Sequence, residues 1–235
     1  MKRIIRYIGV PLASLAAVAV TAAPAFASST PVSAVTPTQI AQLQSDINAR
    51  ITFLNTLSGR IQGSKTLTQS DAATLAGVVG SSSSGDIAAM QSLLASVPSI
   101  TTEGQLHLTY ETLYDNYRIY AVVGPQVDLT IAQDQILSIS SELINLEPTL
   151  NSLIASNGNN PTATAAYDNL VTSAAQAQST ASGLGSYAVS LTPTIYNTDP
   201  TGTHTTITND WQQLKGASAN IKTARSDIST IMKNV

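Results

Sequence analysis

The chain has 235 residues, with 11 Lys and Arg against 14 Asp and Glu, a formal charge of −3, and only 11% charged residues. It has no cysteine, which excludes disulfides, a thiol nucleophile and thiolate metal sites. A mildly acidic chain without a basic run is also a poor partner for nucleic acid or an anionic membrane surface.

The first 27 residues have the pattern of a secretory signal peptide. Three cations among the first six residues precede an apolar core over 8–23, and residues 25–27, Ala-Phe-Ala, match a cleavage site. Cleavage would leave 8 Lys and Arg against 14 Asp and Glu. No later apolar run approaches the ~20 residues of a membrane span. We therefore expect a secreted protein, extracellular or associated with the cell envelope, whose mature form has no membrane span and begins with a flexible leader over 28–35.

Helical periodicity governs the rest of the sequence, and no strand pattern is present. In the first half, Thr36-Pro37 has the pattern of a cap followed by a first helical residue. The glycine- and serine-rich run 80–85 either splits the second helix or is its least stable part, because Gly costs ~1 kcal/mol relative to Ala inside a helix. The helices predicted here cover residues 36–63, 68–97 and 101–124.

The second half begins with the longest apolar stripe of the chain, over 129–153, where apolar residues recur at alternating spacings of three and four. The next helix has an alanine-rich seam, which implies that a neighbouring helix approaches closely. Residues 192–205 lack helical periodicity and are predicted to form the longest internal loop. The helices predicted here cover residues 125–155, 161–191 and 206–233.

These patterns predict an all-α, antiparallel bundle of about six helices. Gly124-Pro125 lies between the two trios of helices and is expected to break or kink the chain, because the residue before proline avoids the helical region. One arrangement is a three-helix unit over 36–124 joined to a second over 125–235. The other reverses the chain at this joint and forms one thicker bundle.

Three segments resemble a group of secreted α-helical proteins of high-GC Gram-positive bacteria. They are DNYRIYAVVGPQVDLTIAQDQI at 115–136, ARITFLNTLSGRI at 49–61 and LTQSDAATLAG at 67–77. The resemblance covers about residues 45–140. It implies a secreted helical protein and carries no activity.

Four of the eight tyrosines lie within eleven residues, and Arg118 lies among them. Aromatic rings with hydroxyls suit contact with a carbohydrate or with peptidoglycan glycan. The same spacing continues a leucine stripe, which favours core positions for Tyr110, Tyr117 and Tyr120, with Tyr114 off the seam. The candidate interaction surface is therefore Tyr110, Tyr114, Tyr117, Arg118 and Tyr120.

Other chemistry has little support in the sequence. His107, Glu111 and Asp115 share a helix face at i, i+4 and i+8, but His204 is the only other histidine, so no bundle-type metal set exists. We expect a solvated face, on which His107 is the only one of the three residues able to bridge to a carboxylate. Motifs of serine hydrolases, nucleotide-binding proteins and zinc proteases are missing. Trp211 continues an apolar stripe and is expected in the core.

We therefore expect a non-enzymatic protein without a cofactor or metal, acting as a structural or protein-interaction bundle of the cell envelope. Its expected partner is a protein or a cell-wall component, and a homo-oligomer is compatible with the sequence. The alternative is a glycan or small-ligand binding module that uses the face from Tyr110 to Tyr120. Because few ion pairs would be lost when carboxylates are protonated, the fold is expected to tolerate acid.

Overall fold

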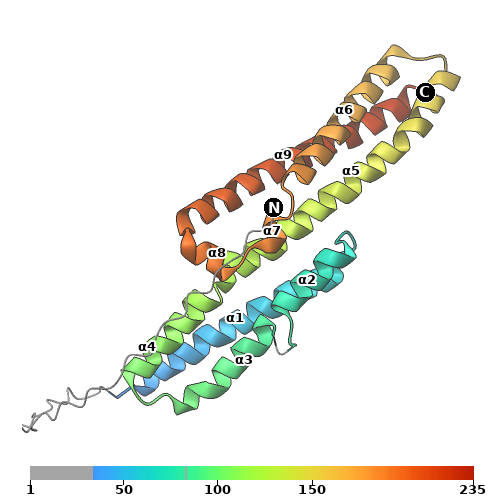
Figure 1. Ribbon diagram of the computed structural model, residues 1–235. Coiled ribbons are helices and arrows are strands. Elements are labelled where there is room, and N and C mark those ends of the chain that lie inside the picture. The colour runs from blue at the N-terminus through green and yellow to red at the C-terminus, as the bar shows by residue number, and fades with distance from the viewer. Residues whose placement is uncertain (1–33, 83) are drawn as a thin grey trace, which may run out of the picture. The chain divides into compact units, whose positions relative to one another are not determined.

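The computed structural model describes residues 34–82 and 84–235. This part of the chain is 85% helical and contains no strand, which confirms the predicted all-α bundle (Figure 1). The predicted signal peptide and leader residues 28–33 lie outside the described residues. None of the described helices is long and apolar enough to cross a membrane.

The first half forms a set of short and medium helices. Two of them begin with capping boxes, in which Thr36 and Thr102 accept from the backbone N–H groups of Gln39 and Gln105, and these glutamine side chains bond back to the cap. The elements are α1 (Pro37–Gly63), α2 (Gln69–Val79), α3 (Asp86–Ser96), the 3₁₀ turn η1 (Val97–Ser99), α4 (Glu103–Glu111) and the π-helical turns η2 (Thr112–Asn116) and η3 (Ile119–Val123).

The second half contains three long helices and two short ones. They are α5 (Gly124–Ser156), α6 (Pro161–Gly183), α7 (Tyr187–Ser190), α8 (Pro193–Thr198) and α9 (Pro200–Lys233). The predicted loop over 192–205 is wrong, because α8 and the first turns of α9 occupy it. Each of these two helices has proline at its first position, after a cap whose side chain accepts a backbone N–H: Thr192 for α8 and Asp199 for α9.

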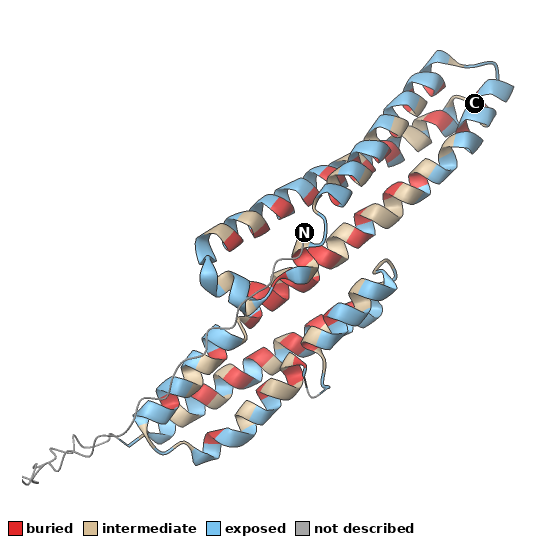
Figure 2. Cartoon of the chain, in the orientation of Figure 1, coloured by how far each residue is buried: buried red, intermediate tan, exposed pale blue. Residues whose placement is uncertain are grey.

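Buried side chains form two hydrophobic clusters, visible as the red faces of the helices in Figure 2. The first cluster joins α1–α4 with η3 and the start of α5. The second joins α5, α6, α7 and α9. Helix α5 takes part in both, because Val127 belongs to the first cluster and Leu129 to the second.

The chain stays helical through Gly124 and Pro125, where we expected a break or a kink. Gly124 has helical dihedrals, and its N–H bonds to the Ile119 carbonyl in the i→i−5 pattern of a π turn. A Cβ on Gly124 would lie 3.1 Å from Cζ of Phe53. The glycine therefore permits the close approach of α1 and α5. The interruption lies earlier, at Arg118, whose φ of 42° is left-handed.

The glycine-rich run splits the predicted second helix into α2 and α3. Gly85 approaches Gly80 so closely that a Cβ on Gly85 would lie 2.1 Å from the Gly80 carbonyl oxygen.

The last two residues of the predicted leader are held by backbone contacts. Ala34 forms an isolated bridge with Thr102, and the Val35 N–H donates to the Thr101 carbonyl. The expected flexibility therefore does not extend to Ala34 and Val35.

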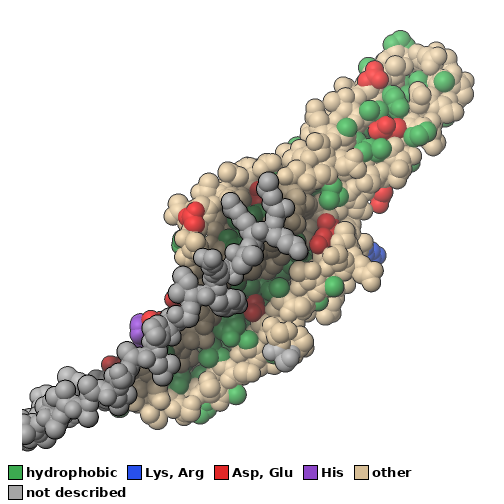
Figure 3. Space-filling model, in the orientation of Figure 1, with side chains coloured by type: hydrophobic (Ala, Val, Ile, Leu, Met, Phe, Trp, Pro, Cys, Tyr) green, Lys and Arg blue, Asp and Glu red, His purple; other side chains and the backbone are tan. Residues whose placement is uncertain are grey.

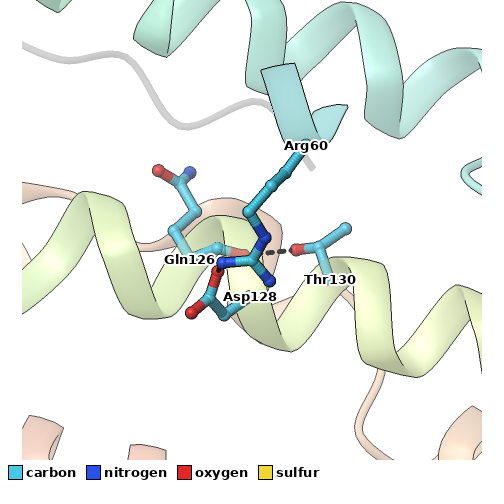
Figure 4. A network of polar contacts seen from close by, with 4 residues as sticks. All are labelled: Arg60, Gln126, Asp128 and Thr130. Carbon is cyan, nitrogen blue, oxygen red and sulfur yellow. Dashed lines mark hydrogen bonds and ion pairs between the residues drawn. The ribbon is translucent and has the colours of Figure 1, made fainter. Parts of the chain in front are cut away.

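Polar side chains connect α5 to elements on both sides. Arg60 of α1 forms an ion pair with Asp128, while the Thr130 hydroxyl donates to the Gln126 carbonyl over 2.8 Å (Figure 4). The buried Gln126 amide donates to the Val189 carbonyl over 2.7 Å. The Arg60–Asp128 pair joins α5 to α1 and the Gln126 bond joins it to α7, whereas the Thr130 bond lies within α5.

Candidate interaction surface

The predicted aromatic surface is organised around Arg50, a buried residue of α1. Its guanidinium donates to the Asp46 carbonyl over 2.9 Å. The same group lies 4.7 Å from the ring centroid of Tyr114 and 5.2 Å from that of Tyr120. A cation within about 6 Å of an aromatic ring is attracted to its face, so Arg50 holds both rings in place.

The two rings that Arg50 holds are half exposed, at 46% for Tyr114 and 49% for Tyr120. Tyr120 also packs on Phe53 with 5.0 Å between ring centroids. Tyr110 stacks on Tyr114 at 6.0 Å, and its hydroxyl donates to an Asp46 carboxylate oxygen over 3.4 Å. Burial, together with the Asp46 charge, raises the pKa of Tyr110.

The structure places three of the four tyrosines as expected. Tyr110 and Tyr117 are partly buried against the first cluster, and Tyr114 lies outside it. The expectation that Tyr120 is a core residue is wrong. The left-handed backbone at Arg118 shifts the phase of the chain, so Ile119 enters the core and Tyr120 turns outward.

Arg118 joins the aromatic surface to α8. Its guanidinium pairs with Asp115 over 2.7 Å, donates to the Asn197 side-chain oxygen over 2.7 Å and lies 5.2 Å from the ring centroid of Tyr196. Asn197 in turn donates to the Asp115 carbonyl over 2.7 Å. The strained backbone of Arg118 is therefore held by a polar clamp between η2 and α8.

A small cavity of ≈ 210 Å³ opens beside these residues, lined by Arg50, Leu113, Tyr114, Arg118, Ile119, Tyr120 and Ala121. It brings two cations and two half-exposed tyrosines together. Three of the five predicted surface residues line it, namely Tyr114, Arg118 and Tyr120. Tyr110 and Tyr117 support the surface from the core side.

The polar face at His107 is as expected. His107 Nε2 lies 3.2 Å from a Glu111 carboxylate oxygen on the exposed face of α4. Asp115 instead pairs with Arg118. Within residues 34–82 and 84–235 no group of three or more His, Asp or Glu is placed to hold a metal ion.

Sequence reasoning missed a second surface. Trp211, expected in the core, is 40% exposed and lines a groove of ≈ 560 Å³ between α5 and α9. The signal was present in the sequence, because Trp211 is four residues before Lys215 and seven before Ser218. These positions form a polar stripe beside the apolar one.

Four carboxyl groups have raised pKa values because they are partly or largely buried. Burial raises the pKa of Asp86 to about 6, although this residue lies in the first turn of α3. Burial also raises the pKa of Asp134, Asp210 and Asp227. At Asp134 the nearby Asp71 adds to the rise, while the bond from the Thr68 N–H opposes it. These groups belong to three helices and form no shared site.

No protein-family model, curated protein or solved structure matches the chain. The chemistry of the aromatic surface is therefore the main structural guide to function. That surface offers stacking faces and hydrogen-bond donors.

Proposed function

We propose that the protein is a secreted, non-enzymatic interaction protein of the cell envelope, and that Tyr110, Tyr114, Tyr117, Arg118 and Tyr120 form its contact surface. One observation carries the proposal: buried Arg50 holds two half-exposed tyrosine rings in fixed positions. Tyrosine and arginine are enriched where binding energy concentrates in protein interfaces. A ring that is already fixed loses little conformational entropy when a partner covers it.

The proposal includes secretion and the relationship to secreted helical proteins of high-GC Gram-positive bacteria. It is supported by the signal-peptide pattern over 1–27 and by the three resembling segments. Cell fractionation with mass spectrometry of the N-terminus tests this part. A chain that remains in the cytoplasm with residues 1–27 intact contradicts it.

A photo-crosslinking amino acid at position 114 tests the contact surface. We expect a cross-linked partner from envelope fractions, and we expect Tyr120→Ala to weaken binding by about thirtyfold, the loss that corresponds to a hot spot of about 2 kcal/mol. The matched control places the crosslinker at Leu146, which is 43% exposed on α5. The same products from both positions, or no loss with Tyr120→Ala, contradict the proposal.

A glycan ligand is the second candidate, because the cavity beside Tyr114 and Tyr120 offers ring faces next to two guanidinium groups. NMR titration of ¹³C-labelled tyrosines with soluble peptidoglycan fragments tests it. We expect the Tyr114 and Tyr120 resonances to shift and the Tyr167 resonance, from α6, to stay in place. Unchanged resonances at positions 114 and 120 reject the glycan.

A further inference from the structure

A groove lies between α5 and α9, and none of the residues of the aromatic surface lines it. Its floor is apolar and consists of the buried residues Ile136, Leu214 and Ile221, and Ile139 of α5 forms part of one wall. Its volume of ≈ 560 Å³ lies within the range of about 300–1,000 Å³ that is usual for binding sites. Helices α5, α6 and α9 pack against one another, so the groove is a seam where a fourth helix can lie.

The other wall is a regular stripe on α9. Its members are all exposed and follow one another at spacings of four, three, four and three: Trp211, Lys215, Ser218, Lys222 and Arg225. Such spacing places them on one side of the helix. At a rise of 1.5 Å per residue the stripe extends over about 21 Å, and its three cations over about 15 Å.

The positive charge of this stripe is unusual in an acidic chain. The described residues contain eight Lys and Arg, of which three line the groove, and no Asp or Glu lines it. None of these three forms an ion pair within the described residues, whereas Arg60 and Arg118 do. In Figure 3, Lys and Arg appear only at one edge of the face shown, while Asp and Glu are spread across it.

We propose that this groove binds an acidic amphipathic helix of a partner protein. The apolar floor and the wall on α5 would cover the partner's apolar stripe, as in other helix-in-groove interfaces. Lys215 and Lys222 are one heptad apart and would pair with acidic side chains that lie about two turns apart on the partner helix, as flanking charges do in coiled coils. A row of cations over about 15 Å matches a row of carboxylates better than a single lipid headgroup.

Trp211 lies at one end of the stripe and would anchor the partner helix. It is the only tryptophan of the chain, and its 40% exposure leaves one part of the indole to be covered. Tryptophan is among the residues that contribute most to interface binding energy. Its fluorescence reports directly on occupation of the groove.

The test uses the full chain and synthetic amphipathic helices of about four heptads with Leu and Ala on the apolar face. One set of peptides has Glu at the flanking positions, and the matched set has Lys there. We expect the Glu peptides to shift the Trp211 emission to the blue and the Lys peptides to leave it unchanged. The triple variant Lys215→Glu, Lys222→Glu and Arg225→Glu should bind Glu peptides at least about tenfold more weakly and gain affinity for Lys peptides.

The matched control is Lys233→Glu, which reverses an exposed charge at the end of the same helix, outside the groove. It should bind Glu peptides like the unmodified chain. Three outcomes overturn the proposal: no response to any Glu peptide, equal binding of both peptide sets, and displacement of the Glu peptide by palmitate or anionic vesicles. Sedimentation that shows a dimer, lost in the triple variant, would assign the groove to a second copy and also overturn it.

Discussion

The two hydrophobic clusters differ in the size of the side chains that fill them. The first uses large aliphatic residues of α1, such as Leu54 and Leu57, which are fully buried. The second contains an α6 seam that is mostly alanine, including Ala174, Ala177 and Ala181, all fully buried. Large side chains keep helices apart and fill the space between them, whereas small ones let the backbones approach.

The two clusters also differ in how regular the surrounding helices are. The alanine seam lies between long helices, and its spacing is close to ideal. The first cluster is covered by short helices, two π turns and a left-handed residue at Arg118. We therefore expect larger side chains to destabilise the second cluster and smaller side chains to destabilise the first.

The largest expected effect is in the first cluster. Leu54→Ala removes a fully buried side chain of α1 and leaves a cavity. We expect the free energy of unfolding to fall by about 2–5 kcal/mol, measured by urea titration. The control is Leu108→Ala on α4, which is 62% exposed and should cost much less. Equal losses for both would contradict the assigned core.

The alanine seam should respond to the opposite change. Ala174→Leu adds volume where α6 is fully buried against its neighbours, and overpacking costs about 1–3 kcal/mol. The matched variant Ala175→Leu puts the same side chain on an exposed position of α6 and should be nearly neutral. If thermal melts showed Ala174→Leu to be as stable as Ala175→Leu, the close approach of these helices would be disproved.

The pH dependence of stability should reflect the buried carboxyls. Because the pKa of Asp86 is raised to about 6 in the folded state, its contribution is fully present below the unfolded pKa and is lost as the pH rises through about 6. The raised pKa values of Asp134, Asp210 and Asp227 act in the same direction. We expect unfolding free energy to be higher at about pH 4 than at about pH 7, with Asp86 contributing about 1–2 kcal/mol after screening.

Asp86→Asn should flatten this profile, because the amide does not titrate. Urea titrations at both pH values check the difference, with Asp168→Asn on the exposed face of α6 as the control. A protein that loses stability steadily from neutral pH to about pH 4 would contradict both this prediction and the acid tolerance expected from the sequence.

The smallest expected effect on stability is at Arg118, where two variants distinguish the cost of the left-handed backbone from the contribution of the side-chain contacts. Arg118→Ala removes the clamp to Asp115 and Asn197 but keeps the left-handed backbone, whereas Arg118→Gly removes both the clamp and the strain. We expect the glycine variant to be more stable than the alanine variant by about 1 kcal/mol. Hydrogen exchange in α8 should be faster in both variants. Unchanged exchange there would show that the clamp does not hold α8.

The sequence predicted the regular elements well, because their signals are local. Thr36-Pro37 and Asn160-Pro161 mark helix starts through capping chemistry, and the alanine seam of α6 is readable from spacing alone. Helix α8 was missed although Thr192-Pro193 is the same kind of start signal, because none of its six residues is buried and it therefore has no apolar stripe. Its contact with Arg118 joins residues 79 positions apart, at Asn197. No local pattern carries that contact.

The residues of the candidate surface could be predicted from the sequence, but their arrangement in space could not. The tyrosines and Arg118 are conspicuous in the sequence, but Arg50, which holds two of the rings, is 64 residues from Tyr114. The position of Tyr120 depends on the backbone of Arg118, which helical periodicity does not anticipate. Gly124 was predicted to be a joint because the residue before proline avoids the helical region. Its observed role, to make room for Phe53 of α1, depends on a residue far away in the sequence.

The shared helix α5 also bears on the order in which the chain folds. The first cluster is incomplete until Val127 is present, and the same helix begins the second cluster two residues later, at Leu129. During synthesis, helices α1–α4 therefore lack part of their core until α5 starts to emerge, and Val189 of α7 adds a later contact. Because α5 contributes to both clusters, loosening of α5 should open both halves together, as one cooperative unit.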